Sequence, residues 1–468
     1  MSERENSLLV EVISRMINIK NTKKPIPKVQ ARGFLGKLPE FRNNPLQFLE
    51  NLNSQCGDIA KFRMGPMYFY YVNHPDYIKH ILITNRKNYH RDRKFLAEGR
   101  PFLGRGLLTT DAEEWGRLRR IAQPVFNANQ MAKYASMISE VATTSLKRWE
   151  ISAQTDQALN IADEMLRLTL DIVAPTLFGI NVTNEWQSFI NSVNVIQAEG
   201  SKRLVTPVTV PLWIPTISNL KANIALQNID STVFGMIAKY RQQQKPHRNL
   251  MSALIEARDE ETGDSLTDRE IRDQVVTLLT AGYETTASIL AWLFLLLSQH
   301  PEVEQKLRHE INLTLGNQSL TYENISSMKY LRMVIQESLR LYPPIWIFAR
   351  SPIQSDNLGD YEIPANTVIY ISPLMVQRHP KFWQSPEDFK PERFDVIEPT
   401  HSDLAYIPFG TGGRSCIGRH FAIMMMQLII IKALQIYRFH LVPNQQIKPQ
   451  FDITLHPKNG IYMKLEKI

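Results

Sequence analysis

The stretch Phe409–Phe421, FGTGGRSCIGRHF, decides how this sequence is interpreted. It is a glycine-rich turn around Cys416, one of two cysteines in 468 residues. A phosphate-binding loop of the Gly-x-x-x-x-Gly-Lys-Ser/Thr type needs a lysine, which this turn lacks. A dinucleotide-binding fingerprint needs a third glycine at the place where Ser415 stands. The turn therefore matches neither of these nucleotide-binding loops.

The cysteine itself points to a metal ligand. Cys416 and His420 are four residues apart, but a structural zinc site needs four ligands, and no second Cys or His pair has a suitable spacing. The remaining interpretation is a single thiolate, in a loop whose glycines let the backbone approach a flat group. A helix is predicted to start near Gly418, and its N–H groups, with Arg414 and Arg419, favour the thiolate over the thiol.

The composition is that of a globular protein with a large core. Apolar residues make up 43% of the chain and charged residues 21%. Cys56 and Cys416 are far apart, which excludes a disulfide framework and suggests a reducing compartment. The net charge of +8 suits an acidic protein, a membrane surface or nucleic acid without choosing among them, and many basic proteins bind none of these.

The N-terminal residues are set apart from the rest. In residues 1–24 a short apolar run is broken by Glu11 and Arg15, which excludes a secretory signal and a spanning helix. This segment is interpreted as a tail or a short amphipathic helix, packed on the domain or lying at a membrane surface. Residues 25–468 are expected to form one large domain.

Two later stretches, Val275–Leu297 and Phe421–Ile436, are long and apolar enough to resemble membrane spans. Glu284 lies in the middle of the first and Lys432 lies in the second, and both would be costly in lipid. We therefore interpret them as helices buried inside a large protein, and a cytoplasmic location is expected.

The remaining patterns predict a mainly α-helical protein with small β-sheets. Residues 59–73 alternate around a turn at Gly65-Pro66 and predict a hairpin. Residues 75–341 are mostly helical in pattern, interrupted at 202–217 by three prolines in an apolar context. Residues 342–415 are rich in proline and predict short strands with few helices.

A long central helix is predicted from Thr267, which fits a capping box with Glu270, to the residue before Pro301. At 1.5 Å per residue its length is roughly 50 Å, so it must cross the molecule. Halfway along, Ala281–Thr286, AGYETT, places glycine, acid and hydroxyls together. We expect Thr285 to donate to the carbonyl of residue 281 and open a notch; a kink without function is the alternative.

Five motifs resemble the cytochrome P-450 family. Phe409-x-x-Gly412-x-Arg414-x-Cys416-x-Gly418 matches all five fixed positions of its haem-ligand loop, in which a cysteine thiolate binds the haem iron. The resemblance runs over essentially the whole chain from about residue 25. It implies the α+β fold of that family, with the long central helix lying over haem b.

The other motifs match further parts of the family. Ala281–Thr286 resembles the oxygen-binding notch, and Trp115-x-x-x-Arg119 resembles the helix that contacts a haem propionate. Glu337-x-x-Arg340 matches the family's Glu-x-x-Arg helix, and Pro391–Phe394 matches the segment that supplies a second arginine. By the resemblance, a structural triad that locks the region around the haem loop would consist of Glu337, Arg340 and Arg393.

The resemblance also implies the site residues. Cys416 would be the axial ligand of the iron, and Glu284 with Thr285 would deliver protons to bound oxygen. Arginines suit the propionates because they form planar contacts and stay charged; for Arg350 a surface position is the alternative. The residues that would bind the cofactor are Trp115, Arg119, Ala281, Arg350, Phe409, Gly410, Arg414, Cys416 and Gly418.

The function implied is monooxygenation of an apolar small molecule such as a fatty acid or terpenoid. Apolar side chains in Pro344–Phe348 suggest a hydrophobic substrate. Trp213 and Ile214 could form an apolar lid or a membrane-touching patch, or pack in the core. Electrons from NAD(P)H would arrive through a separate ferredoxin, flavodoxin or flavoprotein reductase. We expect a monomer without nucleic acid and with at most peripheral membrane contact.

Two other functions remain open. One is a haem-thiolate enzyme that uses peroxide or isomerises its substrate; because such relatives commonly lack the acid and hydroxyl pair, Glu284 and Thr285 favour O2. The other is a haem-binding sensor without catalytic activity.

Overall fold

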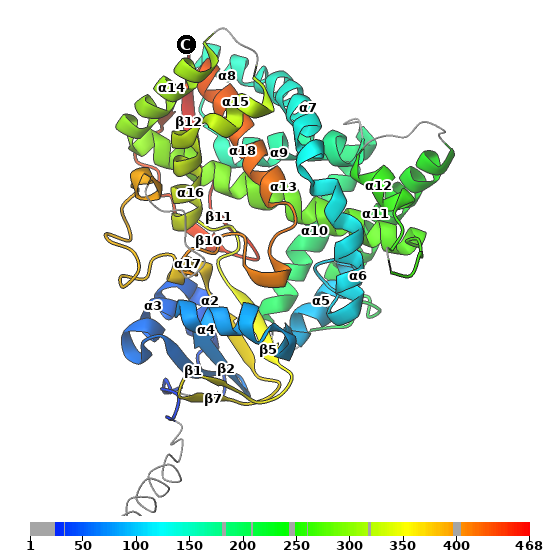
Figure 1. Ribbon diagram of the computed structural model, residues 1–468, viewed down its shortest axis with the longest axis vertical. Helices are drawn as coiled ribbons and strands as arrows, with labels where there is room; N and C mark the ends of the chain where they lie inside the picture. Colours follow the sequence, from blue (N-terminus) through cyan, green and yellow to red (C-terminus); the bar gives the residue numbers. More distant parts are fainter. Residues whose placement is uncertain are drawn as a thin grey trace, which may run out of the picture. The chain divides into compact units, whose positions relative to one another are not determined.

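The structure is a computed structural model that describes residues 24–468 except 32, 180–183, 207–208, 243–248, 260, 317–319 and 396–403. The predicted amphipathic segment before residue 24 lies outside the described residues. The fold is mainly helical with small sheets, as predicted (Figure 1). The chain forms two compact units, a smaller one of residues up to His90 with Ala349–Ile371, and a larger one of Arg91–Phe348 with Ser372–Ile468.

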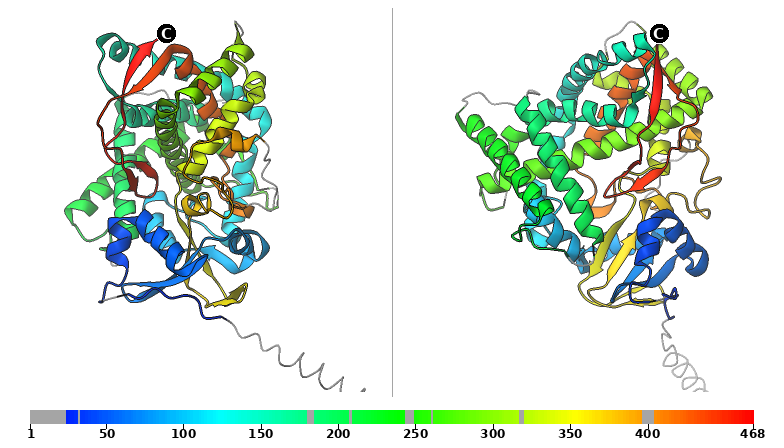
Figure 2. Two further views of the ribbon diagram at one scale, coloured as in Figure 1. Left: turned by 90° about the vertical axis from the view of Figure 1, so that its left-hand side faces the viewer. Right: turned by 180° about the vertical axis from the view of Figure 1, so that it is seen from behind.

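The smaller unit is built on a five-stranded sheet of order β1-β2-β8-β5-β3. The predicted hairpin is present: β1 and β2 are antiparallel, with Ile59 opposite Val72. Helix α3 packs against β1 (Figure 2). The rings of Phe48 and Phe62 are 5.1 Å apart. The elements of this unit are α2 (Leu38–Asn43), α3 (Pro45–Cys56), α4 (Pro75–Lys79), β1 (Ile59–Met64), β2 (Met67–Val72), β3 (Tyr89–Arg91), β5 (Phe348–Pro352), β6 (Asp356–Leu358), β7 (Tyr361–Ile363) and β8 (Val368–Ile371).

The larger unit contains most of the helices and the candidate site. Its helices are α5 (Arg93–Leu103), α6 (Ala112–Ala122), α7 (Ala128–Leu146), α8 (Trp149–Thr155), α9 (Ile161–Phe178), α10 (Asn184–Val205), α11 (Ile217–Gln242), α12 (Leu250–Glu256), α13 (Asp268–Gln299), α14 (Pro301–Leu315), α15 (Tyr322–Ser327), α16 (Lys329–Leu341), α17 (Pro373–Val376) and α18 (Arg419–Ile436). Its strands are β4 (Leu159–Asn160), β9 (Tyr437–Leu441), β10 (Pro449–Phe451), β11 (Leu455–Pro457) and β12 (Tyr462–Lys467).

Helix α13 is the predicted central helix and crosses the larger unit (Figure 1). The predicted capping box is confirmed: Glu270 N donates to Thr267 Oγ1 at 3.2 Å, and Thr267 N donates to Glu270 Oε2 at 2.8 Å. The helix ends at Gln299, and Pro301 begins α14. Local chemistry at both ends therefore fixes its length.

Two helices, α13 and α18, are apolar enough to cross a membrane by length and composition. The apolar windows of the two helices are 72% and 61% buried inside the protein. Helix α13 packs against α9, α11 and α16, and α18 packs against α7. The interpretation of both stretches as core helices is confirmed.

The C-terminal strands bring distant parts of the chain to α13. Strand β12 lies between β4 and β9, and β10 pairs with β11 in a separate hairpin. Leu455 O of β11 accepts hydrogen bonds from Ser288 Oγ and, at 3.2 Å, from Trp292 Nε1. Because Ser288 and Trp292 lie four residues apart on one face of α13, the β10–β11 turn follows that face.

Candidate active site

The loop around Cys416 is a tight backbone turn. Cys416 N donates to Phe409 O at 2.9 Å, which closes the loop between the first residue of the motif and the cysteine. Gly410 and Gly412 have φ of 65° and 68°, a left-handed conformation that favours glycine. A Cβ atom at Gly410 would meet no other atom within 4 Å, so the backbone there borders open space. This is the surface that a flat group could approach.

Cys416 is exposed, but protein atoms lie close around its thiol. Solvent can reach the residue, yet protein surrounds it closely enough that burial raises the pKa of its thiol. A hydrogen bond from Gly418 N–H, at the start of α18, and the charges of Arg119 and Arg419 act in the opposite direction. The influences expected from the helix start and the arginines are therefore present, but burial is the larger one and the pKa of the thiol is raised. Coordination to a metal ion would favour the thiolate.

The middle of α13 is open where the rest of the helix is closed. Between Ile271 and Leu297 every residue is buried except 280–282, Glu284 and Thr285. Thr285 Oγ1 donates to Ala281 O at 2.8 Å, as predicted, and Thr286 Oγ1 donates to the carbonyl of residue 282 at 2.9 Å. The predicted notch is therefore present, with Ala281, Glu284 and Thr285 at its accessible surface.

The Glu284 carboxylate is held from two sides. Thr454 Oγ1 donates to its Oε1 at 2.6 Å, and Gln197 Nε2 of α10 donates to its Oε2. Sequence reasoning missed both partners, because neither stands in a motif or at a helical spacing from Glu284. The notch is thus connected to α10 and to the β10–β11 turn.

Half-buried arginines gather beside the cysteine loop. Arg119 Nη1 donates to Ser415 O at 2.9 Å, and burial lowers the pKa of Arg119 while the charge of Cys416 raises it. The Arg414 guanidinium lies over the Trp115 ring at 4.4 Å from its centre and pairs with the Asp111 carboxylate. The motif Trp115-x-x-x-Arg119 is therefore brought to the loop from α6, as predicted.

A third arginine, Arg91, adds positive charge that sequence reasoning missed. Burial lowers the pKa of Arg91, and burial together with the charge of Arg91 lowers the pKa of Arg414. The two guanidinium groups therefore repel each other in a poorly solvated place. The Asp111 carboxylate pairs with Arg414 and its Oδ2 accepts from Arg91 N at 2.8 Å. The cluster retains an excess of positive charge that would favour an anionic ligand.

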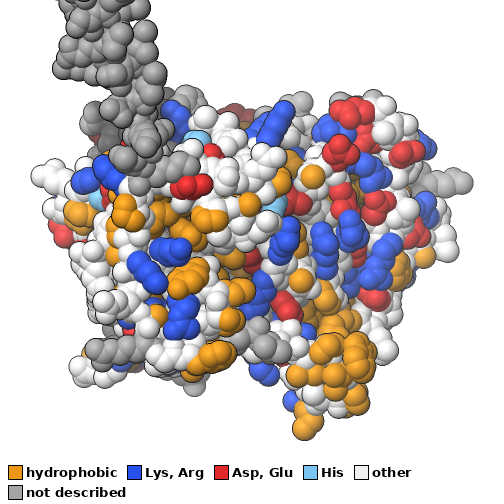
Figure 3. All heavy atoms as spheres, turned by 90° about the horizontal axis from the view of Figure 1, so that it is seen from below, with side chains coloured by type: hydrophobic (Ala, Val, Ile, Leu, Met, Phe, Trp, Pro, Cys, Tyr) orange, Lys and Arg blue, Asp and Glu red, His pale blue; other side chains and the backbone are white. Residues whose placement is uncertain are grey.

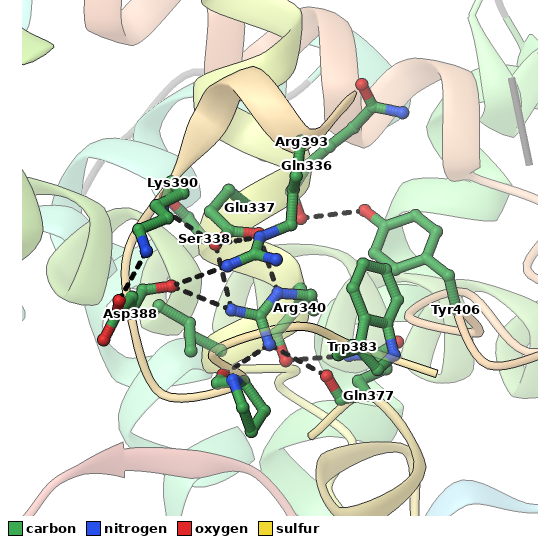
Figure 4. A network of polar contacts seen from close by, with 12 residues as sticks. Gln336, Glu337, Ser338, Arg340, Gln377, Trp383, Asp388, Lys390, Arg393 and Tyr406 are labelled. Atoms are coloured by element: carbon green, nitrogen blue, oxygen red, sulfur yellow. Dashed lines mark hydrogen bonds and ion pairs between the residues drawn. The ribbon is translucent and has the colours of Figure 1, made fainter. Parts of the chain in front are cut away.

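The Glu-x-x-Arg motif on α16 lies in a network of polar contacts in which Glu337 and Arg340 are fully buried and Arg393 is partly buried (Figure 4). Arg340 donates to both oxygens of Glu337, at 2.7 and 2.9 Å, and Arg393 Nε donates to Glu337 Oε1 at 2.9 Å. Arg340 also donates to three backbone carbonyls, those of Gln377, Pro386 and Asp388, at 2.7 to 3.1 Å. The three charged side chains therefore fasten α16 to residues 377–393.

A direct metal site has no support in this geometry. Among the residues that the structure describes, no group of three or more His, Cys, Asp or Glu side chains could hold a metal ion. A zinc site built on Cys416 and His420 is therefore not favoured. The site consists of one cysteine, a notch and a cationic cluster.

Comparison with known proteins shows to which family the chain with this site belongs. The sequence profile described as cytochrome P450 matches residues 26–464. The chain belongs to the cytochrome P450 family. As a cytochrome P450 it is a monooxygenase, as predicted, and haem is the cofactor that the family implies.

Three curated cytochrome P450 relatives match almost the whole chain. Cyclooctatin synthase of Streptomyces melanosporofaciens is 32% identical over 88% of this chain and 89% of its own length. Cyclooctat-9-en-7-ol 5-monooxygenase of the same organism is 34% identical over 87% of this chain and 88% of its own length. Pentalenene oxygenase of Streptomyces avermitilis is 31% identical over 92% and 95%.

The residues present fit haem. The Cys416 thiol reaches open space, where it could bind the iron, and Gly410 leaves room for the flat ring. The excess charge of Arg91, Arg119 and Arg414 matches two propionates. Arg350 lies in β5 of the smaller unit, where its side chain is partly exposed and Nη1 donates to Ala349 O at 2.8 Å. A propionate contact for Arg350 stays a prediction.

The segment between α10 and α11 presents apolar side chains to solvent. Trp213 is 81% exposed and Ile217 is 78% exposed, so core packing is the wrong interpretation for Trp213. The loop is held in place by the buried Asn219, whose Nδ2 donates to Pro211 O and Ile214 O, each at 2.9 Å. The apolar side chains are therefore exposed on a loop that hydrogen bonds hold in place. On the face shown in Figure 3, hydrophobic side chains adjoin Lys and Arg side chains.

Proposed function

We propose that this cytochrome P450 hydroxylates or epoxidises a terpenoid, with O2 and with electrons that pass from NAD(P)H through a separate ferredoxin- or flavodoxin-type protein. The observation that carries the proposal is the accessible Cys416 thiol in the same unit as the notch of α13. The names of the three Streptomyces relatives, which act on terpenoids, support this substrate class over fatty acids.

Each residue group has a task in this proposal. Haem, when bound, supplies an iron whose thiolate ligand promotes cleavage of the O–O bond. Cys416 would hold the iron, and Arg91, Arg119 and Arg414 would hold the propionates. At the notch Thr285 Oγ1 donates to Ala281 O, so the lone pairs of Oγ1 remain able to accept a hydrogen bond. Glu284 stands next to it as the acid that supplies protons.

The substrate would lie against apolar side chains of the larger unit. In Pro344–Phe348, Ile345 and Ile347 are partly exposed, whereas Trp346 is buried and its Nε1 donates to Asp452 O at 2.8 Å. This alternation supports Ile345 and Ile347 as substrate contacts. Trp346 instead fixes the segment to the β10–β11 turn.

The function is tested with haem-loaded protein, a ferredoxin and its reductase, NADPH and a panel of terpenoids and fatty acids under 18O2. We expect one labelled oxygen atom in a terpenoid product, and Thr285→Ala to lower the product formed per NADPH about tenfold or more. The reason is that the hydroxyl that would pass protons on from the notch is lost. Ser298→Ala, near the C-terminal end of the same helix and bonded to Leu295 O at 2.7 Å, serves as control.

Other outcomes of that assay select other functions. Product formation from H2O2 that is unaffected by Thr285→Ala, with none from NADPH, would favour a peroxide-using enzyme. Haem binding without turnover or any substrate-induced spectral change would favour a sensor. Turnover that does not depend on ionic strength would contradict docking of an acidic donor on the face that carries the exposed Arg419.

We further propose a cytoplasmic monomer that touches membranes peripherally through the loop around Trp213. Support comes from the fastened apolar loop and from the exposed Lys202 and Lys221 beside it. An indole and aliphatic side chains flanked by lysines suit the headgroup region of an anionic bilayer.

This contact predicts binding to phosphatidylglycerol vesicles. We expect the protein to sediment with them, and Trp213→Ser with Ile217→Ser to lower the partition coefficient about tenfold, because the buried apolar area is lost. Ile151→Ser is the control, since Ile151 is exposed on α8, away from that loop in the chain. Equal sedimentation of all three proteins would contradict the proposal, and size-exclusion chromatography without vesicles reports the oligomeric state.

A further inference from the structure

Two residues outside the five motifs, Gln197 and Thr454, hold the acid of the notch. Gln197 Nε2 and Thr454 Oγ1 each donate to a different oxygen of Glu284. Gln197 belongs to α10, and Thr454 lies in the turn between β10 and β11. The side chain expected to deliver protons is therefore fixed by elements far from it in sequence.

Tyr283 determines which way the Gln197 amide faces. The Tyr283 hydroxyl lies 2.8 Å from Gln197 Oε1 and 2.9 Å from Asn194 Oδ1, and its single proton can go to one of them at a time. Burial and the charge of Glu284 raise the pKa of Tyr283, so the hydroxyl keeps its proton. Because the Tyr283 hydroxyl donates, the atom of Gln197 that faces it is the amide oxygen. The amide NH2 of Gln197 is then directed toward Glu284.

The Thr454 side of Glu284 is anchored more firmly than the Gln197 side. Thr454 is buried, and the next residue, Leu455, accepts hydrogen bonds from Ser288 and Trp292 on the same face of α13. Helix α10, by contrast, packs mainly against α11 and α5. Gln197 and the Asn194–Tyr283 contact are polar links between α10 and the middle of α13.

We propose that Gln197 is a positioning residue for proton delivery, which holds Glu284 against Thr454 and so makes the acid depend on the position of α10. This rests on the proposed monooxygenase function and names a further part of its proton path. Gln197 touches neither the haem loop nor Thr285 in this network; it acts through Glu284. Loss of Gln197 frees one carboxylate oxygen and lets Glu284 adopt other rotamers.

The first test compares Gln197→Ala with Asn194→Ala in the reconstituted enzyme. Asn194 lies on the same helix and contacts the same Tyr283 hydroxyl, but its amide is not bonded to Glu284. We expect Gln197→Ala to lower product formed per NADPH about five- to tenfold with little change in the substrate Kd, and Asn194→Ala to change it less than about twofold. Equal, small effects of both substitutions would overturn the proposal.

A double-mutant cycle separates positioning from general damage. In a Glu284→Gln background the acid is already absent, so Gln197→Ala is expected to cause no further loss of coupling. The pH dependence of coupling should likewise differ between wild type and Gln197→Ala but not between the two Glu284→Gln proteins. A full additional loss in the Glu284→Gln background would mean that Gln197 acts elsewhere, and would overturn the proposal.

A second cycle requires no turnover. Urea unfolding of the haem-loaded wild type, Gln197→Ala, Glu284→Gln and the double variant measures the link between the two side chains directly. We expect non-additivity of at least about threefold in the unfolding constant, and additive effects would overturn the proposed link. A wild type that shows this coupling but oxygenates nothing would refute the proposed function and leave the Gln197–Glu284 link standing.

Discussion

Cys416→His abolishes the strongly red-shifted Soret band of the dithionite-reduced carbon monoxide complex and reduces NADPH-dependent oxygenation to background. This is the largest effect that we expect from any substitution. Histidine can still bind iron, but a neutral imidazole lacks the electron donation of a thiolate, which promotes O–O cleavage. The measurement is the absorption spectrum of purified protein that was supplied with haem during expression.

The second cysteine offers a matched control. Cys56, at the end of α3 in the smaller unit, is partly buried, and burial raises the pKa of its thiol. Cys56→Ser should retain the red-shifted band. A band that survives in Cys416→His, or disappears only in Cys56→Ser, would show that Cys416 does not bind the iron.

Glu337→Gln removes a large part of the stability of the folded protein. The substitution keeps the shape of the side chain but leaves Arg340, which is fully buried, without its counter-charge. Breaking a buried ion pair from one side costs about 3–5 kcal/mol, a large part of the roughly 5–15 kcal/mol that stabilises a typical protein. We expect the urea midpoint and the haem content of the purified protein to fall sharply, with Arg340→Leu showing a similar loss.

An exposed ion pair next to this network provides the comparison. Lys306 Nζ and Glu392 Oε1 are 2.6 Å apart, and both side chains are exposed. Because solvent screens such pairs, Glu392→Gln should cost about 0–1 kcal/mol, although Glu392 is the neighbour of Arg393. If Glu337→Gln were as mild as Glu392→Gln, the triad would not hold α16 in place.

The parts of the fold that follow from short-range chemistry were predictable. The capping box of Thr267 fixes the start of α13, and Pro301 marks its end. The turn at Gly65-Pro66 fixes the β1–β2 hairpin. The contact of Thr285 with the carbonyl of residue 281 also follows from one helical turn of sequence. Each of these features depends on residues only a few positions apart.

The partners of the site residues were not predictable in the same way. Gln197, Thr454 and Arg91 approach the site through tertiary packing, and no spacing in the sequence relates them to Glu284 or Cys416. The effect of burial on the pKa of the Cys416 thiol was missed for the same reason. Nearby arginines are visible in a motif, whereas the loss of water around a thiol depends on every element packed near it.

The C-terminal strands have a consequence for folding during synthesis on the ribosome, because they contact residues much earlier in the chain. Met463 of β12 opposes Leu159 of β4, and Thr454 reaches back to Glu284. A nascent chain that ends before β10 therefore lacks Thr454, which anchors Glu284 at the notch, and β12, which pairs with β4. The apolar helix α13 is already complete at that stage. Contacts between residues so distant in sequence form slowly and leave apolar surface uncovered meanwhile. The notch is therefore complete only once the C-terminal strands have been synthesised and have packed against the rest of the larger unit.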